Sequence, residues 1–217
     1  GLKLLGAAFS SATRGDVEKI VSDAFDKDPA ENPRILFDEW APTYDKELLS
    51  WGYTAHVRVA TFLAEAGLGA GERVLDVGCG WGIGGIWCAK RFGAAVTSVD
   101  ADPNVFPYLD VVADLNGVRT EHLVRRFERI TTRELERYDL LIGADICFWD
   151  ELTAPVANLV NRAIKAGVGE ILIGDPERSP FLTMAERCID RHGGELLEWC
   201  TRGALAARGT LLHINNR

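Results

Sequence analysis

The residues with the clearest chemical potential are closely spaced glycines that follow a short apolar run and an acid. In the run Val74-Leu75-Asp76-Val77-Gly78-Cys79-Gly80-Trp81-Gly82, an aspartate precedes three glycines at alternate positions. Glycine has no side chain to hold a ligand away from the backbone, so a ligand can approach closely there. A second acid, Asp100, ends the next apolar run, and its carboxylate offers paired acceptors to ribose hydroxyls. These residues indicate a nucleoside-bearing ligand at the edge of a sheet.

Two classes of ligand fit such a loop. Gly80, Gly82 and Gly85 satisfy the G-x-G-x-x-G pattern of dinucleotide-binding proteins. Asp76 argues against a dinucleotide, because a carboxylate at the strand end would repel a diphosphate. S-adenosylmethionine (SAM) carries an ammonium and a sulfonium and has no phosphate, so the same carboxylate suits it. The sequence favours SAM, with an NAD(P)-linked oxidoreductase and a non-catalytic SAM-binding module as the alternatives.

Strand-like and helix-like segments alternate around these residues. Strands are expected at 73–78, 95–100, 121–125, 138–145 and 170–175, followed by two late strands, ELLEWC and TLLHIN. Helices are expected at 82–92, 103–116, 152–166 and 182–192. Strands joined by helices pair in parallel through right-handed crossovers, whereas the last two strands fit a hairpin. The pattern predicts an α/β fold with a doubly wound, mostly parallel sheet that closes with an antiparallel C-terminal hairpin.

These motifs resemble those of a known enzyme family. The run from Asp76 to Gly82 is similar to the D-x-G-x-G-x-G motif of class I SAM-dependent methyltransferases, and Ser98-Val99-Asp100-Ala101-Asp102 is similar to their second motif. The resemblance implies a seven-stranded sheet, SAM as cofactor and transfer of its methyl group. It also implies cofactor contacts from Asp76, Gly78, Cys79, Gly80, Gly82, Asp100 and Ala101.

Two branches of that family share further features with the chain. The segment Asp145-Ile146-Cys147-Phe148 resembles the D-x-x-Y/F element of family 16 protein-lysine methyltransferases, which lies at their substrate entrance. That branch has an aromatic residue against adenine, a role that falls to Phe127. The segment FDEWAPTYD, residues 37–45, is similar to a helix that caps the cofactor in many small-molecule methyltransferases, which places Tyr44 near the methionine part. The resemblance therefore implies one of two acceptors, a protein lysine side chain or a small molecule.

The chemistry of methyl transfer identifies candidate catalytic residues. An amine acceptor must reach the methyl group uncharged, and a carboxylate at the entrance would orient it and assist loss of its proton. Asp145 is the first candidate for this role and Asp150 the second. The loop at 174–181, with Asp175, Glu177 and Arg178, either shapes the acceptor pocket or is a plain turn.

The segment pattern and the composition limit the remaining questions of domain organisation, partners and localisation. Residues 1–33 are expected to form a helical extension, and residues 34–217 the methyltransferase domain, with a helical cap at 34–66. The net charge of −8 disfavours nucleic acid as a partner, and the arginines at 125, 126, 129 and 133 are interleaved with acids. Five cysteines without paired spacing indicate reduced thiols and a cytoplasmic protein. No apolar run predicts a membrane span, and no ligand cluster predicts a metal site.

Overall fold

The computed structural model describes residues 71–200 and 208–217. The expected helical extension at 1–33, the cap at 34–66 and Tyr44 lie outside the described residues.

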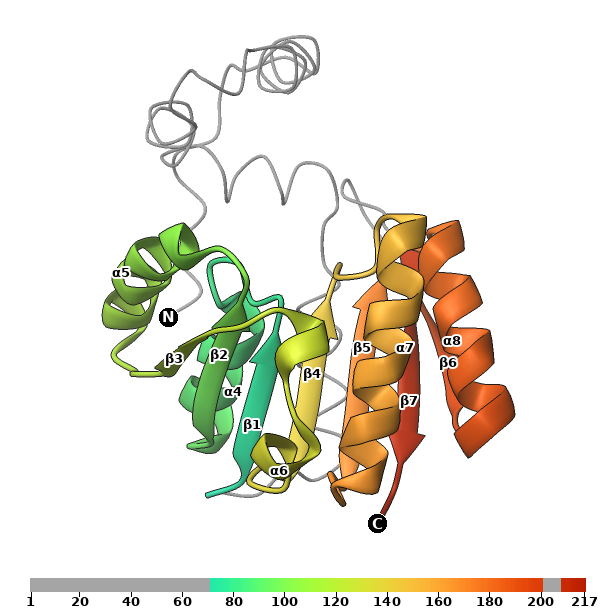
Figure 1. The fold of residues 1–217 in the computed structure, drawn as a ribbon. Helices are drawn as coiled ribbons and strands as arrows, with labels where there is room; N and C mark the ends of the chain where they lie inside the picture. The colour runs from blue at the N-terminus through green and yellow to red at the C-terminus, as the bar shows by residue number, and fades with distance from the viewer. Residues whose placement is uncertain (1–70, 201–207) are drawn as a thin grey trace, which may run out of the picture. The chain divides into compact units, whose positions relative to one another are not determined.

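A seven-stranded sheet organises the described part of the chain (Figure 1). Its strand order is β3-β2-β1-β4-β5-β7-β6. The strands β1 to β5 pair in parallel, while β7 is antiparallel to both β5 and β6. This arrangement confirms the prediction of a mostly parallel, doubly wound sheet with an antiparallel C-terminal hairpin. The strands are β1 (Arg73–Val77), β2 (Ala95–Asp100), β3 (Glu121–Val124), β4 (Leu140–Ala144), β5 (Glu170–Asp175), β6 (Glu195–Cys200) and β7 (Arg208–Asn215).

Helices cover both faces of this sheet, with α7 and α8 on the face toward the viewer in Figure 1 and α4 on the other. Four helices match the predicted positions, and α7 and α8 begin earlier than the sequence pattern indicated. Two short elements, η2 and α6, were not predicted. The helices are α4 (Ile83–Phe92), η1 (Pro103–Val105), α5 (Phe106–Asn116), η2 (Phe127–Arg129), α6 (Thr132–Leu135), α7 (Asp150–Lys165) and α8 (Ser179–His192).

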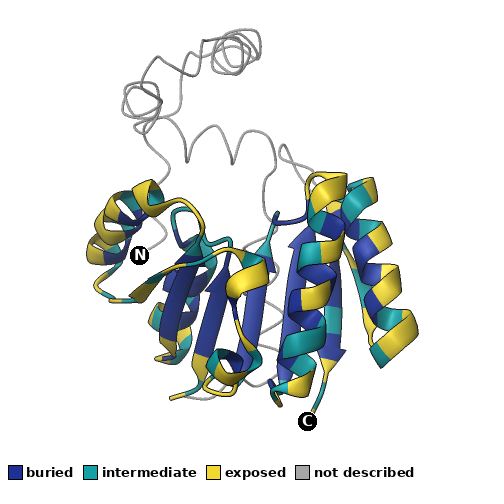
Figure 2. Cartoon of the chain, in the orientation of Figure 1, coloured by how far each residue is buried: buried dark blue, intermediate teal, exposed yellow. Residues whose placement is uncertain are grey.

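Alternation along β1 determines which side chains face each layer. Successive side chains of a strand point to opposite faces of the sheet. Leu75 and Val77 belong to the apolar cluster that includes the buried face of α7, whereas Val74 packs with Cys88 of α4. Asp76 shares the parity of Val74, so it faces α4. The inner strands β1, β2, β4, β5 and β7 are the most buried elements, whereas the edge strands β3 and β6 and the outer faces of the helices are more exposed (Figure 2).

Candidate functional site

A cavity of about 330 Å³ opens at the carboxyl ends of β1, β2, β3 and β4. The chain runs from β1 outward to β3 and then returns to the other side of β1 with β4, so this edge contains the switch point at which ligands bind in open α/β sheets. The wall is built by residues that directly follow these strands and by one residue of α7. They are Gly78, Asp100, Ala101, Arg125, Arg126, Phe127, Glu128, Asp145, Ile146, Phe148 and Leu152.

The glycine loop forms the floor at the end of β1. Gly78, Gly80 and Gly82 all adopt the left-handed backbone conformation, with φ of 61°, 50° and 75°, which disfavours residues with side chains. Gly78 also has a steric requirement, because a Cβ there would lie 2.6 Å from Cγ2 of Ile146. The Gly82 N–H donates to the carbonyl of Cys79 at 2.7 Å, so the loop closes tightly before α4 begins.

Asp100 connects the glycine loop to the end of β2. Its Oδ2 accepts a hydrogen bond from the Gly80 N–H at 3.0 Å, and its Oδ1 accepts one from the Asp102 N–H at 3.0 Å. A carboxylate offers about four acceptor positions, so each oxygen keeps one position for a ligand. Because Asp100 lines the cavity, these positions are available to paired hydroxyls.

Asp76 has a different environment from Asp100. Its side chain is 5% exposed, and Oδ2 accepts a hydrogen bond from the Gly85 N–H in the first turn of α4 at 2.9 Å. Burial raises the pKa of Asp76 to about 7, an effect that the charge of Asp100 reinforces and the Gly85 hydrogen bond opposes. Asp76 does not line the cavity, so in this structure it acts on the site through the glycine loop and α4.

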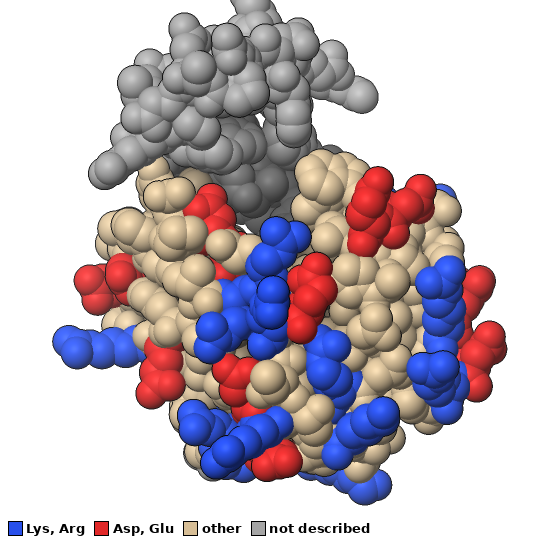
Figure 3. Space-filling view, viewed as in Figure 1, with Lys and Arg blue, Asp and Glu red and all other residues tan. Residues whose placement is uncertain are grey.

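The opposite wall comes from the segment after β3. Phe127 opens η2, and its ring approaches the glycine loop, since Cζ lies 3.5 Å from the position of a Cβ on Gly78. The neighbouring arginines are paired with acids: Arg125 with Glu134 at 3.1 Å and Arg126 with Glu128 at 3.8 Å. Basic and acidic side chains are interleaved on this face of the molecule (Figure 3).

Asp145 forms the wall at the end of β4. It is one of two non-glycine residues with positive φ in the described ranges, at 63°, and such backbone strain clusters at functional sites. Its carboxylate pairs with Arg178, whose Nη2 also lies 3.1 Å from Oδ2 of the buried Asp175. The guanidinium carbon is 5.8 Å from the centre of the Phe148 ring. Arg178 therefore joins the loops that follow β4 and β5.

Several predicted residues lie outside the cavity wall. Asp150 is exposed in the first turn of α7, and Cys79 is bound through its N–H to the carbonyl of Val99 at 3.0 Å. Neither residue lines the cavity, nor do Gly80 and Gly82, which shape the loop behind it. Cys147 is fully buried, and burial raises the pKa of its thiol to about 11, which leaves it protonated and a weak nucleophile at neutral pH.

The structure brings five predicted residues together at the cavity, and they are Gly78, Asp100, Ala101, Phe127 and Asp145. The sequence analysis missed Arg178 as the partner of Asp145 and Leu152 as a wall residue. No local pattern signals the pair, because Asp145 and Arg178 become neighbours only through the pairing of β4 with β5.

This combination of strand order, glycine loop and carboxylate at the end of β2 defines the seven-stranded fold of class I methyltransferases. A family model described as a methyltransferase domain matches residues 74–167.

Individual relatives are methyltransferases as well. The chain is 30% identical over 111 residues to the electron transfer flavoprotein beta subunit lysine methyltransferase of Xenopus laevis, covering 51% of this chain and 44% of that protein. It is 30% identical over 135 residues to the ribosomal protein L11 methyltransferase of Thermus thermophilus, covering 62% of this chain and 51% of that protein. The chain thus spans about half the length of these curated relatives.

Solved structures share the fold at lower identity. The magnesium protoporphyrin IX methyltransferase of Synechocystis, crystallised with SAH, superposes with a TM-score of 0.61 at 16% identity, covering 91% of this chain and 99% of that one. Within residues 71–200 and 208–217, no helix is long and apolar enough to cross a membrane. The same residues contain no group of three or more His, Cys, Asp or Glu side chains placed to hold a metal ion.

Proposed function

We propose that the chain binds SAM in the cavity at the ends of β1 to β4 and transfers its methyl group to a nucleophilic acceptor. The observation that carries the proposal is Asp100. Its two oxygens are fixed by backbone N–H groups of Gly80 and Asp102, and each keeps an acceptor position at the cavity. The methyltransferase-domain match over residues 74–167 supports the same cofactor.

The walls of the cavity fit the other parts of SAM. Phe127 offers an aromatic surface for adenine, and the left-handed Gly78 lets the sulfonium-bearing end of the ligand approach the backbone. The other charged residues of the wall form ion pairs, whereas Asp100 accepts hydrogen bonds from backbone N–H groups; the paired residues are Arg125, Arg126, Glu128 and Asp145. The Asp100 carboxylate therefore favours a ligand that carries a sulfonium and an ammonium. This electrostatic argument rests on Asp100 rather than on Asp76, which faces α4.

The sheet topology weighs against the dinucleotide alternative. The dinucleotide-binding fold has strand order 3-2-1-4-5-6 and consists of two parallel mononucleotide-binding halves. Here an antiparallel strand, β7, is inserted between β5 and β6. The G-x-G-x-x-G match at Gly80, Gly82 and Gly85 therefore reflects the close packing of a loop and helix that both classes of fold need.

For the acceptor, we propose a protein lysine side chain that enters past Asp145 and Phe148. Phe148 and Trp149 are exposed by 39% and 63% and pack edge to face, with ring centroids 4.6 Å apart. Asp150 and Glu151 are exposed beside them, so the entrance offers aromatic and anionic contacts to a cationic side chain. The 30% identity to a lysine methyltransferase supports this choice, and a small-molecule amine or alcohol is the alternative.

The residues at the entrance suit the chemistry of an amine. Bound SAM supplies a methyl group on a sulfonium, and a neutral thioether leaves when the amine nitrogen forms the new bond. The amine must first lose its proton, and Asp145 would accept its N–H bond and orient the lone pair. Arg178 pairs with the Asp145 carboxylate and so holds it in place at the entrance.

Calorimetric titration of the purified chain tests the cofactor. We expect SAM and S-adenosylhomocysteine (SAH) to bind, and NAD and NADP to give no heat of binding. Binding of NAD or NADP without SAM or SAH would refute the proposal and restore the oxidoreductase alternative.

Methyl transfer tests the acceptor. The protein is incubated with SAM labelled in its methyl group and with native cell lysate, and the label is followed into protein bands and the low-mass fraction. Methyllysine in a labelled band, absent with an Asp100→Ala variant, is the expected result. Label confined to the low-mass fraction would favour a small-molecule acceptor, and SAH binding without any labelled product would favour a binding module.

A further inference from the structure

The cavity wall that carries Phe127 is a short turn rather than part of the sheet. The element η2 spans three residues, and the Ile130 N–H closes it with a bond to the Phe127 carbonyl at 3.4 Å. Three residues of 3₁₀ turn have little intrinsic stability, because they form few hydrogen bonds for the backbone entropy they lose. Side chains from outside the turn must therefore fix its conformation.

Arg162 of α7 is the residue that does so. Its Nη2 donates to the Phe127 carbonyl at 2.6 Å, and its Nε donates to the Ile130 carbonyl at 2.8 Å. Both acceptors belong to the same turn, one at each end. The planar guanidinium holds its donors in a fixed fork, and hydrogen bonds from a charged donor are stronger than neutral ones, so this contact fixes both distance and orientation.

The two ends of the turn have different environments. The Ile130 side chain is 1% exposed and packs in the same apolar cluster as Leu159 and Val160 of α7. The Phe127 side chain is only partly buried against this cluster and lines the cavity. Core packing therefore anchors the Ile130 end, whereas the Phe127 end, which the ligand would contact, depends more on Arg162.

We propose that Arg162 is a positioning residue for the cofactor, which acts by holding the Phe127 ring where it receives the adenine. This inference rests on the proposed function, because it assigns adenine to Phe127. Arg162 does not line the cavity, and its hydrogen bonds go to the two carbonyls of the turn. Its charge also interacts with that of Glu128 on the cavity wall, which is why the Arg162→Lys variant, with the charge kept, belongs to the test.

Three single variants and calorimetry with SAH and adenosine test the proposal. Arg162→Met removes both donors and keeps the length of the side chain, and we expect its affinity for SAH to fall about 10-fold and its affinity for adenosine to fall by a similar factor. Arg162→Lys keeps the charge and one donor group, so it should recover part of this loss. Lys165→Met is the matched control, since Lys165 is an exposed cation on the same helix, and its affinity should stay within about two-fold of wild type.

A double variant separates positioning from general stabilisation. If Arg162 acts through Phe127, the variant with both Arg162→Met and Phe127→Ala should bind SAH about as weakly as Phe127→Ala alone. Thermal unfolding of each variant shows that the comparison is made on folded protein. The inference would be overturned if the double variant lost SAH affinity by the product of the two single losses. It would also be overturned if Arg162→Met bound SAH within two-fold of wild type. A wild-type protein that binds neither SAM nor SAH would instead overturn the proposed function.

Discussion

Asp100 has a structural role, and in the proposed function the same carboxylate binds the ribose hydroxyls of the ligand. Its bonds to the N–H groups of Gly80 and Asp102 fix the oxygens before a ligand arrives, so binding needs little reorganisation. A carboxylate that is fixed in this way gains more from each added hydroxyl donor than a flexible one. The affinity for SAH should therefore depend strongly on this residue.

We expect Asp100→Ala to weaken SAH binding by about 1 to 3 kcal/mol, the value of one or two charged hydrogen bonds. Isothermal titration calorimetry measures the effect. Asp114→Ala serves as control, because Asp114 is an exposed carboxylate of α5 away from the cavity. Unchanged affinity in the Asp100 variant would exclude the ribose role.

Asp76 makes the free energy of unfolding depend on pH, and a single variant can isolate this contribution. The pKa is raised from 3.8 to about 7 by burial, so between these pH values the native state binds a proton that the unfolded state has lost. The stability contributed by Asp76 is therefore greatest at low pH and declines as the pH rises toward 7.

Asp76→Asn keeps an acceptor for the Gly85 N–H and removes the titration. Between pH 4.5 and 8, we expect wild type to lose about 3 kcal/mol of unfolding free energy relative to this variant, at about 1.4 kcal/mol per pH unit up to pH 7. Urea unfolding across this pH range provides the measurement. Burial also raises the pKa of Asp175, to about 6. Asp175 titrates in both proteins, so its contribution cancels in the difference between their unfolding free energies. Parallel curves for the two proteins would show that Asp76 is ionised in the native state throughout.

Local spacing predicted the residues that directly follow the strands, because the carboxyl ends of parallel strands meet at one edge. Gly78, Asp100 and Asp145 lie together at the cavity for this reason. The sequence could also have predicted which face of the sheet the Asp76 side chain points to. Alternate residues of a strand share a face, so Asp76 lies on the same face as Val74 and opposite to Leu75. The ion pair of Asp145 with Arg178 could not, because it depends on how two loops pack after β4 and β5 have paired.

At the scale of elements, strong periodicity predicted each described strand and the long helices, while the short elements were missed. The α6 helix has a capping box, in which Thr131 accepts from the Glu134 N–H and the Glu134 carboxylate accepts from the Thr131 N–H at 2.8 Å. Its T-x-x-E pattern is a local signal that sequence analysis could have used. By contrast, η2 has no local signal, because Arg162 fixes it from a distant helix.

The close packing of α4 against the sheet bears on why glycines continue from the loop into the first turn of the helix. A Cβ on Gly85 would lie 2.8 Å from Cγ1 of Val96 and 2.9 Å from Oδ2 of Asp76. On the adjacent Gly84, the nearest atom to a Cβ would be Cδ1 of Ile142 at 3.5 Å, which is ordinary contact.

We therefore expect Gly85→Ala to destabilise the fold by about 1 to 3 kcal/mol through overpacking. Gly84→Ala should be neutral or stabilise the fold by up to about 1 kcal/mol, because alanine favours the helix. Chemical denaturation of this matched pair gives both values. A Gly85→Ala variant as stable as Gly84→Ala would show that α4 does not need the close approach to Val96 and Asp76.

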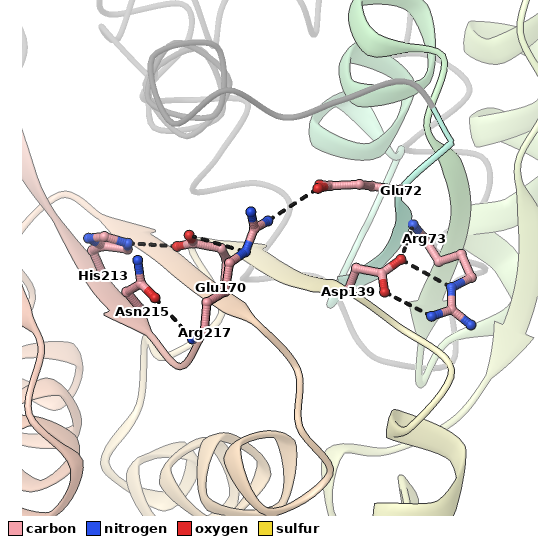
Figure 4. A network of polar contacts seen from close by, with 7 residues as sticks. All are labelled: Glu72, Arg73, Asp139, Glu170, His213, Asn215 and Arg217. Atoms are coloured by element: carbon pink, nitrogen blue, oxygen red, sulfur yellow. Dashed lines mark hydrogen bonds and ion pairs between the residues drawn. The ribbon is translucent and has the colours of Figure 1, made fainter.

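At the scale of the whole described fold, the edge of the sheet opposite the cavity carries a polar network (Figure 4). Glu170, at the start of β5, is 5% exposed and accepts from His213 of β7 at 2.8 Å. Arg217 lies 3.7 Å from Glu170 and 3.2 Å from Glu72, which connects the end of β7 to the residue before β1. The cavity and this network thus lie at opposite edges of the sheet, which predicts that stability and ligand affinity can be changed separately.

Glu170→Ala should show this separation, because it leaves the His213 and Arg217 side chains without their buried carboxylate. We expect a loss of about 3 kcal/mol in unfolding free energy and an SAH affinity within two-fold of wild type. Glu195→Ala is the matched control, since it removes the exposed partner of the same histidine, 3.2 Å from Nδ1, and should cost less than about 1 kcal/mol. Unfolding by urea and calorimetry with SAH, measured on both variants, decide the outcome. A folded Glu170 variant with a ten-fold loss of SAH affinity would mean that the sheet transmits changes from this edge to the cavity, because no residue of the network lines it.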